Sequence, residues 1–163
     1  MKLSTRARYA LRMTLDIARN HGGESPVSLS GVSQRTSISH GYLEQLAQAL
    51  RNAGILRGVS GRHGGYRLAR PPAEISVGQV IEAAIGRVCL LDCLGDSEVC
   101  PNSDDCEPRA LYVLINRGIT DVIHRYTLAD LLDPSWIEEV GSADPFSDGS
   151  KAAAPSPSGK KCV

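Results

Sequence analysis

The feature that most constrains the fold is a pair of short amphipathic helices joined by a three-residue turn. The first helix is predicted to follow Ser28 through "LSGVSQRT", and "SIS" then forms the turn. Ser39 is placed to cap the second helix, "HGYLEQLAQALRNAG", and Gly54 to stop it. The apolar residues of this second helix recur at helical spacing: Leu43, Leu46, Ala47 and Leu50. Two helices connected in this way are typical of a helix-turn-helix.

The segment that follows, "ILRGVSGRHGGYRLARPP", predicts a β-hairpin. Two β-prone runs, residues 55–59 and 66–69, flank a glycine-rich turn that carries basic residues at its tip. A helix-turn-helix followed by a basic hairpin predicts a winged helix, with the second helix in the DNA major groove and the hairpin tip on a neighbouring groove or backbone. An ordinary helical hairpin that binds no DNA is the alternative.

Charge is distributed unevenly along a chain that is neutral overall. Residues 1–73 contain eleven Lys and Arg against three acids, whereas residues 74–163 contain seven against fifteen. Between Glu44 and Glu74 there is no acid, but five arginines fall there. A basic first half favours a polyanionic partner over a merely solvated basic face. Together with the hairpin, it predicts binding to a double-stranded DNA operator.

The candidate DNA-contacting residues lie near the start of the second helix and on the hairpin. Gln can pair with adenine and Glu can accept a hydrogen bond from cytosine, while a glycine allows close approach of the backbone. Hairpin arginines suit phosphates or a minor groove. The predicted set is Ser39, His40, Gly41, Tyr42, Glu44, Gln45, Gln48, Arg57, Arg62 and Arg67.

The remaining elements follow from caps and periodicity. A helix is expected from Ser4 to about His21, another after Ser76, and an irregular loop through the cysteine segment. A long helix with a broad apolar face is predicted from Pro108 through about residue 126. Thr127 and Asp130 resemble the capping box of a last short helix. The segment from residue 134 onward is rich in Ser, Gly, Ala, Pro and Lys, and this composition predicts that it is disordered.

Four of the five cysteines lie within residues 89–106. With no apolar run of about 18 residues and a charged N-terminus, we expect a cytoplasmic chain without a membrane partner, where thiols stay reduced and a disulfide is disfavoured. Zinc usually requires two cysteine pairs, each spaced by two to four residues, and no such pair of pairs is present; a polar loop does not suit core thiols. An iron–sulfur cluster is favoured. Because all four histidines lie outside this loop and no catalytic motif surrounds a cysteine, an enzyme is not expected.

Four segments in order, "YALRMTLDIA", "SISHGYLEQLAQALRNAGIL", "GRHGGYRLARP" and "ISVGQVIEA", closely resemble the IscR family of iron–sulfur cluster regulators and its redox-response-factor superfamily. The resemblance covers about residues 1–135. It implies a homodimeric transcription factor that is mainly α with a small β-hairpin: a winged helix-turn-helix plus a long C-terminal dimerisation helix. The implied organisation is a DNA-binding domain at 1–86, a cysteine loop at 87–107, a dimerisation region at 108–133 and a disordered tail at 134–163.

The resemblance assigns Cys93, Cys100 and Cys106 as the cluster ligands, for 2Fe–2S as in the IscR family or alternatively 4Fe–4S. It implies a repressor-type regulator of iron–sulfur biogenesis or stress genes that senses cluster or redox status. The first cysteine gap is six residues, where close relatives of IscR commonly have five. The family's fourth ligand, a His, is replaced by Arg109, and the carboxylate that other branches use is replaced by Arg8.

Candidates for the fourth ligand are Cys89, a local carboxylate (Asp104, Asp105 or Glu107) and a group of the partner subunit. The position of Cys89 directly after a predicted helix also suggests that its side chain packs. The alternative function, also found in the superfamily, is a cluster-free regulator of sulfur metabolism that senses thiols or a partner enzyme.

Overall fold

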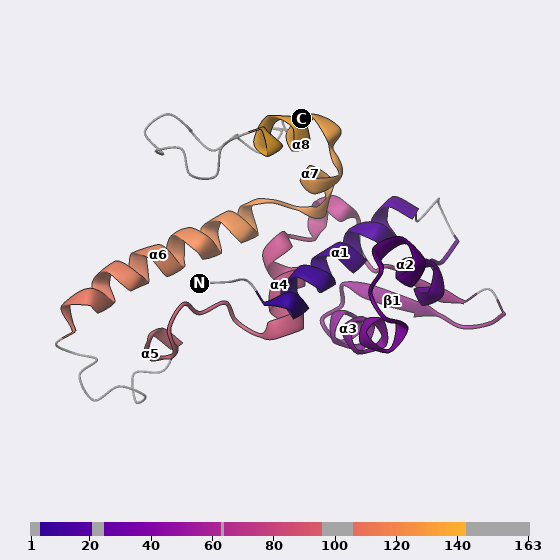
Figure 1. Ribbon diagram of the computed structural model, residues 1–163, viewed down its shortest axis with the longest axis horizontal. Coiled ribbons are helices and arrows are strands. Elements are labelled where there is room, and N and C mark those ends of the chain that lie inside the picture. The colour runs from indigo at the N-terminus through magenta and orange to yellow at the C-terminus, as the bar shows by residue number, and fades with distance from the viewer. Residues whose placement is uncertain (1–3, 21–24, 63, 96–105, 143–163) are drawn as a thin grey trace.

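The computed structural model describes residues 4–20, 25–62, 64–95 and 106–142, which form a mostly helical molecule with one small sheet (Figure 1). Its elements are, in chain order, α1 (Thr5–Asn20), α2 (Leu29–Thr36), α3 (His40–Asn52), β1 (Leu56–Val59), β2 (Gly65–Leu68), the 3-10 turn η1 (Pro72–Glu74), α4 (Val77–Ile85), α5 (Asp92–Gly95), α6 (Glu107–Arg125), α7 (Leu128–Leu132) and α8 (Pro134–Gly141). The expected fold class, mainly α with a winged helix-turn-helix and a long C-terminal helix, is confirmed.

The helix-turn-helix is formed by α2, the turn Ser37–Ser39 and α3. The Ser28 hydroxyl accepts a hydrogen bond from the Gly31 amide at 3.2 Å, as a helix N-cap does. Ser37 closes α2 in the left-handed region, with φ of 59°. Ser39 occupies the N-cap position of α3, but its side chain makes no capping hydrogen bond.

The hairpin pairs β1 with β2 in antiparallel register, within one residue of the predicted ends. An extra bridge adds Val27 to the sheet through reciprocal backbone bonds with Tyr66, each 2.8 Å long. At Gly65 a Cβ would lie 2.4 Å from the Val27 carbonyl oxygen, so any larger residue would force the backbone apart. Gly64 is constrained separately, because a Cβ there would lie 2.5 Å from the Val59 carbonyl oxygen.

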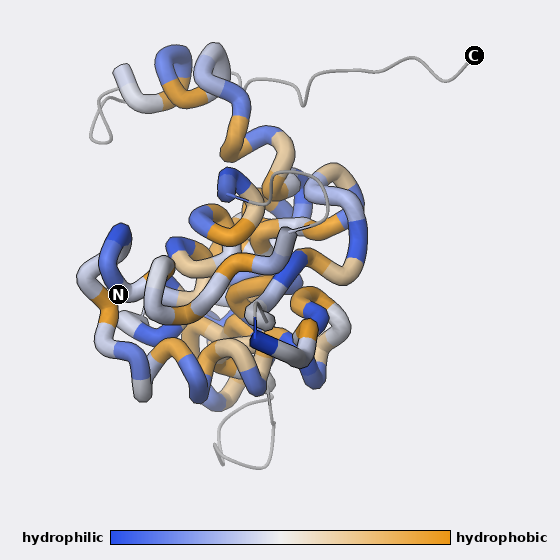
Figure 2. The backbone as a smooth tube through the Cα atoms, turned by 90° about the vertical axis from the view of Figure 1, so that its right-hand side faces the viewer, coloured by the Kyte–Doolittle hydropathy of each residue, from blue (hydrophilic) through white to orange (hydrophobic). Residues whose placement is uncertain are grey.

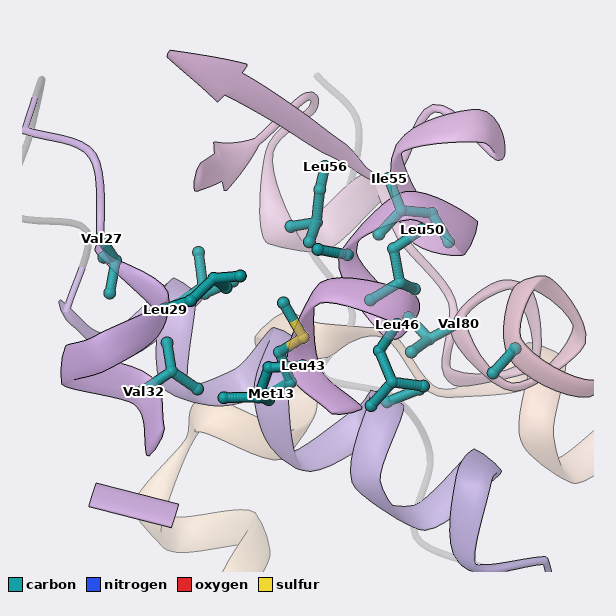
Figure 3. Packing of buried hydrophobic residues seen from close by; sticks show 14 of the residues in the cluster. Met13, Val27, Leu29, Val32, Leu43, Leu46, Leu50, Ile55, Leu56 and Val80 are labelled. Atoms are coloured by element: carbon teal, nitrogen blue, oxygen red, sulfur yellow. The ribbon is translucent and has the colours of Figure 1, made fainter. Parts of the chain in front are cut away.

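The core is formed where α1, α3 and α4 meet beneath the hairpin. Met13 of α1, Leu46 of α3 and Val80 of α4 are completely buried together (Figure 3). All four of the periodic apolar residues predicted for α3 are buried. Figure 2 shows hydrophobic and hydrophilic stretches alternating along the backbone of the body. Burying one stripe of each helix is what the sequence periodicity predicts.

The starts of α4 and α7 are each closed by a capping box. The predicted box is confirmed: Thr127 accepts from the Asp130 amide, and the Asp130 carboxylate accepts from the Thr127 amide at 2.8 Å. Ser76 and Gln79 make the same reciprocal arrangement at the start of α4. The two N-cap residues, Ser76 and Thr127, also form an antiparallel bridge. This bridge places the segment just after the C-terminal end of α6 beside the start of α4.

Two segments differ from the expectations. The cysteine loop includes a short helix, α5, and the tail expected to be disordered from residue 134 begins with helix α8. Asp133 caps α8 by accepting from the Ser135 amide at 2.9 Å, and Pro134 fits its first turn. Trp136 then packs on Tyr126 with ring centroids 5.2 Å apart. This half-buried ring helps to hold a segment that also contains Ile137 and Val140; residues 143–163 lie outside the described residues.

Candidate nucleic-acid interface and cysteine segment

One side of α3 is exposed near its start and carries most of the residues predicted to read bases. The exposed set is Ser39, His40, Gly41, Glu44, Gln45 and Gln48. Apart from Gly41's chain neighbours and the backbone of its own helix, no atom of the described residues lies within 4 Å of where a Cβ would sit on Gly41, so this point of the helix is open to close approach. His40 and Glu44 lie one turn apart, with Nδ1 and Oε1 separated by 3.6 Å.

Tyr42 differs from the other predicted residues of α3 because it is half-buried. Its ring meets that of Tyr9 edge-to-face, with centroids 5.9 Å apart and planes at 89°. The Arg8 guanidinium carbon lies 5.6 Å from the Tyr9 ring centroid on the same cluster. Tyr42 therefore orients α3 against α1 rather than projecting freely. The sequence pattern did not indicate this contact.

The hairpin presents its arginines without acidic partners. Arg57 and Arg67 are directly opposite each other in the β1–β2 register, and Arg62 is exposed at the turn. Within the described residues, none of these three arginines forms an ion pair. Like charges opposite each other on a hairpin destabilise it, and a polyanion relieves that repulsion. This surface is thus electrostatically suited to phosphates.

Arg35 of α2 lies in the same domain but forms an ion pair within the protein, which the hairpin arginines do not do among the described residues. Its guanidinium donates to the Asp16 carboxylate of α1 from Nε to Oδ1 at 2.9 Å and to Oδ2 at 3.2 Å, and from Nη2 to Oδ2 at 2.7 Å. The hydrogen bond to Asp16 raises the pKa of Arg35, and the ion pair between them holds the guanidinium in place. Arg35 ties two helices together, in contrast to the hairpin arginines.

Two of the three predicted cluster cysteines are described, and they lie on neighbouring elements. Cys93 is in α5 and Cys106 is the N-cap residue of α6; both are half-buried free thiols. Helix α5 contacts α6, near its first turns (Figure 1). Cys100, like the carboxylates Asp104 and Asp105, lies outside the described residues. The described ranges contain no group of three His, Cys, Asp or Glu side chains able to hold a metal.

Cys89 is exposed, so the expectation that its side chain is committed to packing is wrong. Its thiol donates to the Leu91 carbonyl at 2.9 Å. The neighbouring Leu90 amide donates to Oδ1 of Asn116 at 2.8 Å. Asn116 comes ten residues after Cys106, about 15 Å along the helix at 1.5 Å per residue. This clasp, which the sequence pattern did not reveal, holds Cys89 beside the middle of α6.

The other residues considered for the fourth ligand also have defined places. Glu107 is exposed in the first turn of α6. Arg109 is half-buried, and its Nε is enclosed without a hydrogen-bond partner among the described residues. His124 lies at the opposite end of α6, where it contacts Ser76 and Glu82 of the α4 region. The structure therefore keeps His124 far from Cys106, as the helix length predicts.

Helix α6 extends away from the body and contains no buried residue (Figure 1). Four apolar side chains form an exposed stripe, here called the outer stripe, with the following exposed fractions: Leu111 59%, Leu114 64%, Ile115 39% and Val122 49%. Ile119 and Ile123 instead line a cavity of about 290 Å³ against α4 and the segment that leads to α5. The broad apolar face predicted for this helix is thus divided between two sides.

Among the described residues, no helix is long and apolar enough to cross a membrane. The sequence model of the Rrf2 family, described as an iron-dependent transcriptional regulator, matches residues 3–134. The protein rrf2 of Nitratidesulfovibrio vulgaris is 40% identical over 132 residues, covering 81% of this chain and 87% of that protein.

The regulator IscR of Vibrio vulnificus is 38% identical over 140 residues, covering 86% of this chain and 82% of that protein. The solved structure of CymR, the global cysteine regulator of Bacillus subtilis, matches with a TM-score of 0.68 and 35% identity, covering 81% of this chain and 96% of that chain. Several regulators with different names thus resemble this chain to a similar degree, at 35% to 40% identity. The chain belongs to the Rrf2 family of transcriptional regulators.

Proposed function

We propose that this regulator is a homodimer that reads a DNA operator through α3 and the hairpin, and that it senses iron–sulfur or redox status through a cluster bound by Cys93, Cys100 and Cys106. The observation that carries the sensing part is the pair of free, half-buried thiols on α5 and α6, two elements in contact. Control of iron–sulfur biogenesis or stress genes is the regulatory role that the IscR resemblance favours.

For DNA reading, the exposed start of α3 supplies the base-contacting side chains. Gln45 and Gln48 are exposed on the helix, and Gly41 leaves the space that a groove wall needs. Arg57, Arg62 and Arg67 would bind phosphates or the minor groove beside it. Each copy of the chain then reads one half-site.

For assembly, the outer stripe of α6 is the surface that a second copy would cover. Its four apolar side chains are exposed in the single chain, on a helix with no buried residue. Contiguous exposed apolar surface on a soluble chain marks an interaction site. Pairing α6 of one copy with α6 of the other would bury this stripe.

The residues present fit an iron–sulfur cluster by their chemistry, because thiolates are the ligands that these clusters use. The enclosed Nε of Arg109, one turn after Cys106, is a donor without an acceptor, and a negatively charged group nearby would satisfy it. When bound, the cluster would supply the redox- and iron-sensitive centre. The protein would hold Cys93 on α5 and Cys106 at the start of α6, so that occupancy of the site ties α5 to α6.

The second candidate function is a cluster-free regulator that senses thiols or a partner enzyme of sulfur metabolism. It is favoured by the similarity to CymR, whose identity to this chain, 36%, is close to that of IscR, 38%. The exposed thiol of Cys89 is compatible with this function.

Iron and sulfide analysis of anaerobically purified protein tests the proposal. We expect wild type to contain a cluster with visible absorbance, and Cys93→Ala and Cys106→Ala each to lose it. Cys89→Ala is the matched control and should keep it, because the neighbouring Leu90 amide donates to Asn116, which holds this segment beside the middle of α6. Wild type without iron and sulfide, but with normal operator binding, would favour the cluster-free function.

A further inference from the structure

The side chain of His124 lies where the C-terminal end of α6 meets the N-terminal part of α4. This contact region is here called the His124 joint. His124 lies in the last turn of α6. Its imidazole contacts two residues of the α4 region, one at the N-cap and one in the second turn. Nδ1 lies 3.3 Å from Oγ of Ser76, the N-cap residue, and Nε2 lies 3.4 Å from Oε2 of Glu82. The ring therefore spans α4 from its cap to its second turn.

Gly78 makes room for that ring. A Cβ at this position would lie 2.6 Å from both Cε1 and Nε2 of His124, closer than real Cβ contacts. Glycine inside a helix is less stable than alanine, so its place in the first turn of α4 has a packing reason. That reason is the close packing of the His124 ring against Gly78.

Backbone bonds fix the two segments on either side of the ring. The Val77 amide donates to the Tyr126 carbonyl at 2.9 Å, and the Leu128 amide donates to the Ile75 carbonyl at 2.9 Å. Helix α4 in turn packs on α3, where Val80 shares the buried core with Leu46 (Figure 3). The contacts around His124 therefore link α6 to α4 and, through α4, to α3.

We propose that His124 is a positioning residue that, seated on Gly78, holds α6 at a fixed angle to the DNA-reading helix α3. This inference rests on the proposed function, in which α6 joins two copies and each α3 reads one half-site. Half-sites read by such dimers lie about one helical turn of DNA apart, so the angle at this joint selects their spacing. A change at the cysteine end of α6 would reach α3 through the same contact.

The test compares His124→Ala, Gly78→Ala and the double variant, with Gly141→Ala as the matched control. Gly141 is also a helical glycine, but no atom lies within 4 Å of its added Cβ. The first readout is hydrogen exchange at the Val77 and Leu128 amides. We expect exchange about tenfold faster in both single variants and unchanged in the control. The double variant should match His124→Ala, because the added methyl acts only by displacing the ring.

The second readout is affinity for operators whose half-site spacing is changed by one or two base pairs. Both single variants should lose the preference for one spacing, while binding to an isolated half-site stays as in wild type. His124→Gln provides a second substitution if the alanine variant does not fold.

Unchanged amide exchange in His124→Ala overturns the inference. Faster exchange with the spacing preference intact also overturns it, because the contact would then be structural only. In both cases wild type still prefers one spacing, so the proposed function survives. A wild type with no spacing preference would instead refute the dimeric reading and the inference together.

Discussion

Removing one arginine of the opposed pair on the hairpin should raise the stability of the fold and weaken DNA binding at the same time. Arg57 and Arg67 are register partners, and side chains so paired have Cβ atoms about 4.5–5.5 Å apart. Cross-strand pairs contribute about 0.2–1 kcal/mol, and like charges have the unfavourable sign. We therefore expect Arg57→Gln, which removes the charge but keeps a long polar side chain, to raise the free energy of unfolding by about 0.2–1 kcal/mol at low salt.

Salt separates this electrostatic effect from a change in packing. The Debye length falls from about 10 Å at 0.1 M salt to about 3 Å at 1 M, so the gain in stability should largely vanish at 1 M. On DNA, each neutralised phosphate contributes about 0.9 to the slope of log affinity against log salt. Loss of one contact should lower that slope by about one and weaken all sequences alike.

Urea unfolding at the two salt concentrations and fluorescence anisotropy with labelled operator DNA measure both quantities. Arg117→Gln is the control, since Arg117 is exposed on α6, outside the helix-turn-helix and the hairpin. It should leave the salt slope unchanged. The reasoning is refuted if Arg57→Gln loses stability at low salt, or if its salt slope equals that of wild type.

Two further predictions address assembly and base reading. Leu114→Glu should yield folded monomers by light scattering, because Leu114 is 64% exposed in the single chain and only a second copy would bury it; a mass equal to that of wild type would contradict pairing through α6. Gln45→Ala should relax base preference at one operator position, a discrimination worth about 1–3 kcal/mol, and leave the salt slope intact; an unchanged preference in competition binding would remove Gln45 from the reading surface.

The winged helix could be predicted from the sequence because its determinants are local. The spacing of Leu43, Leu46 and Leu50 defines the buried stripe of α3, and Ser28 marks the start of α2. Turn glycines mark the hairpin to within one residue of its ends. The Thr127–Asp130 capping box was likewise visible as a three-residue spacing. In each case the partners are close in sequence.

The contacts that sequence patterns missed join residues far apart in the chain. Asn116 binds a segment 26 residues earlier, and the Ser76–His124 contact spans 48 residues. Helix α8 was missed because the composition of the whole tail predicted disorder, although Asp133 and Pro134 mark a helix start and Trp136 packs on Tyr126. A polar residue between the apolar positions of α6, and a glycine in the first turn of α4, were the only local signs of these contacts.

The division of α6 into two sides changes how its sequence is interpreted. Periodicity alone places Leu114, Ile115 and Ile119 on one broad apolar face, yet Ile119 lines a cavity within its own chain. A charge at Ile119 would therefore disturb the contact with α4 as well as assembly, and could not separate the two. If α6 pairs two copies as proposed, substitutions in the outer stripe should act on assembly, whereas substitutions at Asn116 or His124 should act on how α6 is held to the rest of the chain. Substitutions on the two sides of α6 can thus test the proposed dimer contact and the proposed positioning of α3 separately.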